Sequence, residues 1–211
     1  MRLVVHEFVT LDGVIQGPGG PDEDVTGGFT RGGWGVPYFD DEVAGIVDSW
    51  FARTAEVLLG RTTYRMMADY WPLVTDPDDR VAAVLNRVPK HVVSSSADGL
   101  DWDGALVLEG DPVEAVAALK ARPGGELQVH GSALLAGALV AAGLVDELRL
   151  LTFPITVGDG KRLFPPDAAP SGFRSLEGRA LANGSTYVAL EPEPFRIGEF
   201  VVDEDGRERA V

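Results

Sequence analysis

The hydrophobic positions of this 211-residue chain follow two alternating periods. Short runs of β-branched and aromatic residues, such as RLVVHEFV at 2–9, have the composition of buried strands. Between such runs, as at 40–54, apolar residues recur at three- and four-residue spacing, which is typical of an amphipathic helix. The pattern predicts strands at 2–9, 55–60, 90–95, 126–130 and 147–154, and helices at 40–54, 62–71, 78–87, 112–120 and 132–143.

The last third of the chain changes character, because its strand-like segments follow one another with turns and no helices between them. These segments are 162–164, 173–181 and 185–192, and their succession indicates antiparallel pairing at one edge. The whole pattern predicts a three-layer α/β fold, in which a mixed, mostly parallel sheet has helices on both faces and an antiparallel C-terminal edge. We expect one domain over 1–192 and a charged tail at 193–211 with one short strand and a frayed end.

A long segment at 17–37 is rich in glycine and proline and has no sustained period. Loops of this length inside a compact domain are commonly functional, so the segment could form a lid over a site. The alternative, an insertion that is merely tolerated, is equally open.

Charge and composition narrow the classes of partner and cofactor. With 33 acidic and 18 basic residues, the net charge of −15 repels nucleic acid and anionic membrane surfaces, so neither is an expected partner. The chain has no cysteine, which excludes disulfides and thiolate metal sites, and its three histidines are far apart, so no metal is expected. The longest uncharged run, 131–145, is too short to span a membrane, and we expect a cytoplasmic protein.

Three predicted strand ends carry residues that suit a phosphate or a ribose. At the first, Gly60 permits close approach, Arg61 supplies a forked cation, and Thr62 and Thr63 offer hydroxyl and N–H groups. A plain helix cap by Thr62 explains the same residues.

The second and third strand ends each have a functional and a structural interpretation. The second places three hydroxyls in a row, Ser94, Ser95 and Ser96, which could bind a ribose phosphate or form a solvated turn. The third is His130-Gly131-Ser132 before a helix whose uncharged first turn leaves N–H groups available to an anion, unless it is an ordinary tight turn. Since the chain has neither GxGxxG after its first strand nor a P-loop, the coincidence of three such ends favours a dinucleotide bound in another way.

A set of longer motifs resembles a known family. These motifs are TLDGVI at 10–15, LLGRTTY at 58–64, PKHVVSS at 89–95, VHGSALLAGAL at 129–139 and GLVDELRLLTFPITVGDGKRLF at 143–164. Together, over residues 1 to 191, they resemble the dihydrofolate reductase-like proteins that share the reductase domain of the riboflavin-biosynthesis deaminase-reductase. The resemblance implies NADPH across the strand ends, with contacts from Ile15, Gly17, Gly60, Arg61, Thr62, Ser94, Ser95, Ser96, Gly131, Ser132, Leu134 and Leu135.

The resemblance also implies an acidic residue early in the first long helix, where Asp40 and Asp41 lie. Asp40 is the better catalytic candidate, because it shares a helix face with Val43 and Val47, but an N-cap without chemistry is the alternative. The substrate pocket is not assigned by the sequence. Five aromatic residues could form a wall for a flat substrate or belong to the core: Trp34, Tyr38, Trp50, Trp71 and Phe153.

Taken together, the sequence and the resemblance imply an NADPH-dependent reductase that passes hydride to a small unsaturated or carbonyl-containing substrate. The alternatives are an NADPH-binding protein without turnover, with a sensor or storage role, and a structural protein that keeps only the fold. A homodimer is the expectation from the family, and the uncharged stretch 131–145 and the apolar strand at 147–153 are candidate shared surfaces.

Overall fold

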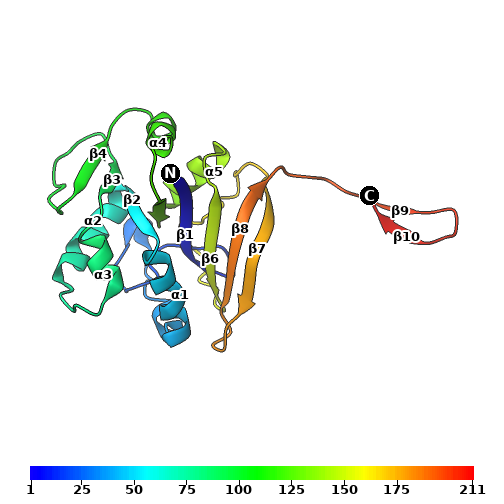
Figure 1. Ribbon diagram of the computed structural model, residues 1–211. Coiled ribbons are helices and arrows are strands. Elements are labelled where there is room, and N and C mark those ends of the chain that lie inside the picture. The colour runs from blue at the N-terminus through cyan, green and yellow to red at the C-terminus, as the bar shows by residue number, and fades with distance from the viewer.

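The computed structural model describes residues 1–211 and consists of an α/β body and a projecting C-terminal hairpin (Figure 1). Its sheet has eight strands in the order β4-β3-β2-β5-β1-β6-β8-β7. The six strands from β4 to β6 are parallel, whereas β8 and β7 are antiparallel to their neighbours. The body strands are β1 Arg2–Thr10, β2 Thr54–Gly60, β3 Lys90–Val93, β4 Ala105–Leu108, β5 Glu126–His130, β6 Glu147–Phe153, β7 Gly172–Ala180 and β8 Thr186–Glu193.

Five α-helices cover the two faces of the sheet. They are α1 Asp41–Phe51, α2 Arg61–Tyr70, α3 Arg80–Leu85, α4 Pro112–Lys120 and α5 Ala133–Ala141. Buried residues of α1, α2 and α3 share one hydrophobic cluster with the sheet, and those of α4 and α5 share a second cluster on the other face. The predicted three-layer α/β fold, with its mostly parallel sheet and antiparallel C-terminal edge, is therefore confirmed. None of the helices is long and apolar enough to cross a membrane.

Two sequence predictions about elements were wrong, and one strand was missed. Residues 162–164 form no strand but a single bridge between Arg162 and Val14, since this segment closes a turn and does not enter the sheet. The edge strand β4 was missed, because ALVL at 105–108 is only four residues long and has no alternation. The tail is not frayed but folds as a hairpin of β9 Phe200–Val202 and β10 Glu208–Ala210.

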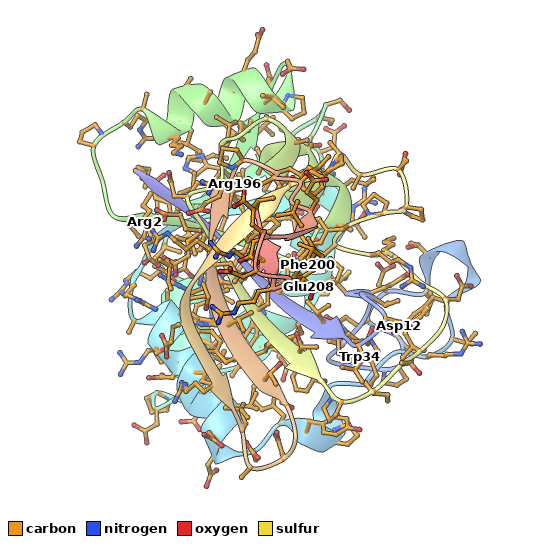
Figure 2. The ribbon with its side chains drawn as sticks, turned by 90° about the vertical axis from the view of Figure 1, so that its right-hand side faces the viewer. Arg2, Asp12, Trp34, Arg196, Phe200 and Glu208 are labelled. Carbon is orange, nitrogen blue, oxygen red and sulfur yellow. The ribbon has the colours of Figure 1, made fainter.

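The glycine-rich loop at 17–37 is fixed to the body by a small number of polar contacts. Gln16 is buried, and its side-chain amide donates to the carbonyls of Asp24 and Thr26 at 3.0 and 2.9 Å. The indole of Trp34 donates to the carbonyl of Gln16 at 2.8 Å, and Lys161 forms an ion pair with Asp24 at 2.6 Å. The loop is thus a packed cover at the carboxyl end of β1, where Figure 2 shows Asp12 and Trp34.

Candidate functional site

The three strand ends that the sequence singled out lie side by side. Strands β3, β2 and β5 are consecutive in the sheet and run parallel, so their carboxyl ends meet at one edge. Gly60 is paired in register with Val93, the residue that precedes the three serines. This topology confirms that the three strand ends are neighbours. We call them the first corner (residues 60–63), the second corner (94–96) and the third corner (130–132).

The first and third corners interlock through glycines. A Cβ atom at position 60 would clash with the hydroxyl of Ser132 and lie 3.1 Å from its Cβ. A Cβ atom at position 131 would lie 3.2 Å from the Cγ2 of Thr63. Glycine at positions 60 and 131 therefore lets the start of α2 and the turn before α5 approach closely, which brings the N-terminal ends of both helices to one place.

The turn before α5 has an unusual backbone. Gly131 and Ser132 adopt consecutive left-handed conformations, with φ angles of 65° and 68°, and Ser132 is the only residue other than glycine with positive φ. Such strain costs about 1–3 kcal/mol and is concentrated at functional sites. No side chain caps α5, and its first turn carries no acidic residue, so its N–H groups remain available to an anion.

The first and second corners are joined by Arg61. Its guanidinium donates to the Ser94 hydroxyl at 3.3 Å, to the Ser96 carbonyl at 3.0 Å and to the Asp98 carbonyl. These partners are neutral, so the positive charge of Arg61 is not cancelled by an ion pair. The arginine both orders the 94–98 loop and holds a cation at the edge where the strands end.

A cleft of about 470 Å³ opens beside the serines, between the ends of β3 and β4. Ser94 and Ser95 line one wall, and Leu108, Glu109 and Gly110 line the other. Sequence reasoning missed the second wall, since it depends on the unrecognised strand β4. The only sequence signals of a strand here were Gly104, directly before ALVL, and Asp111-Pro112, shortly after it.

The other residues predicted to contact the cofactor differ in burial and in location. Ile15 and Leu135 are buried in the same cluster on the α5 face, whereas Leu134 is 88% exposed at the start of α5. Gly17 is the first residue of the 17–37 loop, and its carbonyl accepts from the N–H group of Gly33 at 2.7 Å. Thr62 is exposed on the first turn of α2.

Asp40 is the N-cap of α1, because its carboxylate accepts from the N–H groups of Glu42 and Val43 at 3.1 and 3.0 Å. These contacts are those of an N-cap, which was the alternative to a catalytic role, and no contact links the carboxylate to the strand ends. Its catalytic role therefore stays a prediction.

Replacing Asp40 separates its two roles. We expect Asp40→Ala to lower the free energy of unfolding by about 0.5–2 kcal/mol, because the cap is lost, and Asp40→Asn to retain most of it. Urea unfolding of the two variants measures this difference. If the asparagine variant keeps its stability but loses an activity that the wild type shows, the carboxylate has a role beyond the cap.

Most of the aromatic residues belong to the core. Phe153 is fully buried and contacts Trp34 and Tyr38, each with 5.8 Å between ring centroids, while Trp71 pairs with Tyr70 elsewhere. The half-buried Phe8 and the exposed Phe39, 6.2 Å apart, form the outer part of this cluster.

Two polar residues near the strand ends are engaged in internal contacts. His130 is buried between His6 and Phe51, with stacked rings 4.8 and 4.7 Å away, so its ring is not open to a ligand. Asp12 joins two turns, because it accepts from the N–H groups of Val157 and Gly158 at 3.3 and 2.7 Å. Burial alone would raise the pKa of Asp12, but these bonds and one from Thr10 together lower it.

Glu7 is a buried titratable group that the sequence did not indicate. It lies between Val5 and Val9 on the side of β1 that faces α5, and its Oε1 has no hydrogen-bond partner. Burial raises the pKa of Glu7 well above its usual value, although the Gly131 N–H opposes this shift. The neutral, protonated form of Glu7 is therefore favoured beside the third corner.

The fold and the arrangement of its strand ends define an α/β protein of the dihydrofolate reductase-like class. Residues 2–187 match the RibD C-terminal domain, and the chain belongs to that family. The uncharacterized protein YyaP of Bacillus subtilis (strain 168) is 29% identical over 189 residues, which are 89% of this chain and 93% of that protein.

Solved structures with low sequence identity share the fold. A putative riboflavin biosynthesis protein from Shewanella sp. PV-4 has a TM-score of 0.62 at 19% identity, over 92% of this chain and 99% of that one. A pyrimidine reductase-like protein from Corynebacterium diphtheriae has a TM-score of 0.62 at 16% identity, over 92% of both chains. Dihydrofolate reductase from Enterococcus faecalis, complexed with NADP(H), has a TM-score of 0.58 at 16% identity, over 90% of this chain and 96% of that one.

Proposed function

We propose that this protein is an NADPH-dependent reductase that transfers hydride to a small unsaturated or carbonyl-containing molecule. The observation that carries the proposal is the interlocked edge, where Arg61 joins the first corner to the second and Gly60 admits Ser132 of the third. Family membership supports the reductase class, and the Enterococcus relative of the same fold is complexed with NADP(H).

The residues at this edge fit the charge and shape of the cofactor. Phosphate groups would meet the Arg61 guanidinium and the uncapped N–H groups at the start of α5, where the helix dipole favours negative charge. The hydroxyls of Ser94 and Ser95 in the neighbouring cleft suit a ribose phosphate. Since neither Gly60 nor Gly131 has a side chain, the backbone there can lie close to the cofactor.

When bound, NADPH would supply the hydride from its nicotinamide ring, and the chain would supply binding and orientation. Arg61 would offset the charge of the phosphates, which an overall acidic protein otherwise repels. The packed 17–37 loop would exclude water from the carboxyl end of β1, because its contacts through Gln16 and Trp34 hold it against the body.

The alternative is an NADPH-binding protein without turnover, as a sensor or in a structural role. One observation favours it: the only acidic residue assigned to catalysis, Asp40, is engaged as a helix cap. Incubation with NADPH and a panel of dihydrofolate, pyrimidine and simple carbonyl compounds distinguishes the two, because only a reductase consumes NADPH.

Arg61→Ala tests the cofactor site directly. We expect NADPH binding to weaken by about 1.5–3 kcal/mol, because a charge-assisted hydrogen bond to phosphate is lost. Fluorescence titration measures the affinity, with Arg65→Ala as the matched control, since Arg65 is exposed one turn further along the same helix. If both variants bind as tightly as the wild type while remaining folded, Arg61 is not a phosphate ligand.

A further inference from the structure

The C-terminal hairpin makes no polar contact with the body. Every hydrogen bond and ion pair of residues 196–211 joins two residues of that same segment, including the reciprocal backbone pair between Glu199 and Val211. Figure 1 shows the hairpin standing away from the sheet, beyond β7 and β8. We call residues 196–211 the arm.

The arm exposes apolar side chains that nothing covers. Ile197, Phe200 and Val202 are 88%, 73% and 71% exposed. Phe200 and Val202 lie on the same face of β9, and Ala210 is paired opposite Phe200 on β10. A two-stranded hairpin is marginally stable in water, so an apolar face of this kind indicates a surface against which the arm packs.

The body has an uncovered edge of its own. Strand β7 ends the sheet, so its outer side has no partner strand, and residues 174–180 are exposed. Leu176, at a bulge in β7, is 42% exposed. Phe164 is 41% exposed beside Phe173, with 5.8 Å between ring centroids. An unpaired edge with apolar neighbours is a template for pairing with another strand.

The geometry of the arm favours a second copy of the chain as the partner. The arm follows Glu193, which is paired with Gly172 at the first residue of β7, and then leads away from the sheet and does not fold along β7 (Figure 1). In Figure 2, which faces this edge, Phe200 and Glu208 lie in front of the sheet. In a two-fold pair, each arm would cover the edge of the other copy, so both open surfaces would be closed in the same contact.

We propose that the arm docks on the β7 edge of a second copy of this chain, with Phe200 packed against the apolar residues around Leu176. The dimer is reciprocal, and each interface consists of one arm and one edge. This inference does not depend on the proposed reductase activity.

Analytical ultracentrifugation of the full chain tests the docking. We expect the wild type to form a dimer and Phe200→Asp to weaken it by at least ~100-fold, because the burial of one phenylalanine is lost in each of two interfaces. Leu176→Asp should weaken the dimer through the other side of the same contact. Leu73→Asp is the matched control, since Leu73 is 77% exposed and lies on the body away from the arm, and its dimer should be unchanged.

A mixture of the two variants identifies reciprocal docking. The Leu176→Asp chain has an intact arm and the Phe200→Asp chain has an intact edge, so mixing them should restore a dimer that neither forms alone. A monomeric wild type at all concentrations, as expected if the arm folds back on its own edge or binds another protein, would overturn the proposal. A dimer that survives both substitutions, or a mixture without recovery, would equally reject it.

Discussion

Replacing Arg149 by methionine is expected to lower the free energy of unfolding by about 3–5 kcal/mol. The side chain of Arg149 is 1% exposed and forms a bidentate pair with Glu126, at 2.8 and 3.0 Å, and a second pair with Glu147. Glu126 and Glu147 are themselves 12% and 6% exposed, so removal of the arginine leaves two carboxylates with little water. Their remaining cations are half-exposed, Arg53 at 3.9 Å from Glu126 and Arg2 at 2.5 Å from Glu147. The cost comes mainly from these poorly compensated charges, and the loss of packing is a smaller part.

Urea unfolding followed by circular dichroism measures the effect. Arg80→Met is the matched control, because Arg80 pairs with Asp48 at 2.7 Å while both side chains are about half exposed. An exposed pair of this kind contributes about 0–1 kcal/mol. Adding Glu126→Gln and Glu147→Gln to Arg149→Met should recover part of the lost stability, since the poorly compensated buried charges are removed. Equal losses for Arg149→Met and Arg80→Met would show that burial does not strengthen the network.

The same network shows where the sequence stops being informative. Strands β5 and β6 alternate polar and apolar residues at their start, as in ELQVH, which is the pattern of a sheet with one face in water. In the structure, these polar residues instead lie beneath the end of α1, where Gln128 donates to the Trp50 carbonyl and His130 stacks on Phe51. Glu126 accepts from the buried Arg149, so the face is paired internally. Periodicity identifies the face of a strand but does not tell whether a polar face is solvated or internally paired.

The position of the candidate site could be predicted from the sequence, but the contacts within it could not. Parallel strands placed the three corners at one edge, because connections through helices leave all carboxyl ends on the same side. The contacts that join the corners could not be predicted, since they depend on the spacing between backbones. Neither the clash that excludes a Cβ at Gly60 nor the bond from Arg61 to Ser94 has a local sequence signal. The wall formed by Leu108 and Glu109 was lost with β4, because a four-residue edge strand lacks a detectable period.

Acid is expected to destabilise the fold through its buried histidines. Burial lowers the pKa of His130 to about 3, helped by the positive charge of Arg149, and burial also lowers the pKa of His6. An unfolded histidine has a pKa of about 6.5, so between pH 6.5 and 3 the unfolded chain binds the proton that the folded chain excludes. Stability therefore falls as the pH falls through this window, by about 1.4 kcal/mol at pH 5.5 and about 4 kcal/mol at pH 3.5 from His130 alone.

The effect can be assigned to His130 with one variant. Urea unfolding at pH 7, 5.5 and 3.5 avoids the isoelectric point near 4.5, where the protein is least soluble. His130→Phe keeps an aromatic ring between His6 and Phe51 but loses the bond to Gln128, so it should be less stable at pH 7. Its loss of stability on acidification should be smaller than that of the wild type by the contribution of His130. Carboxylates such as Glu126, whose pKa is lowered despite burial by hydrogen bonds from Arg149, destabilise both proteins alike in acid. Glu7, whose pKa is raised by burial, also acts equally on both proteins. If the two proteins lose equal stability between pH 7 and 5.5, the His130 ring takes up a proton in the folded state, contrary to its burial.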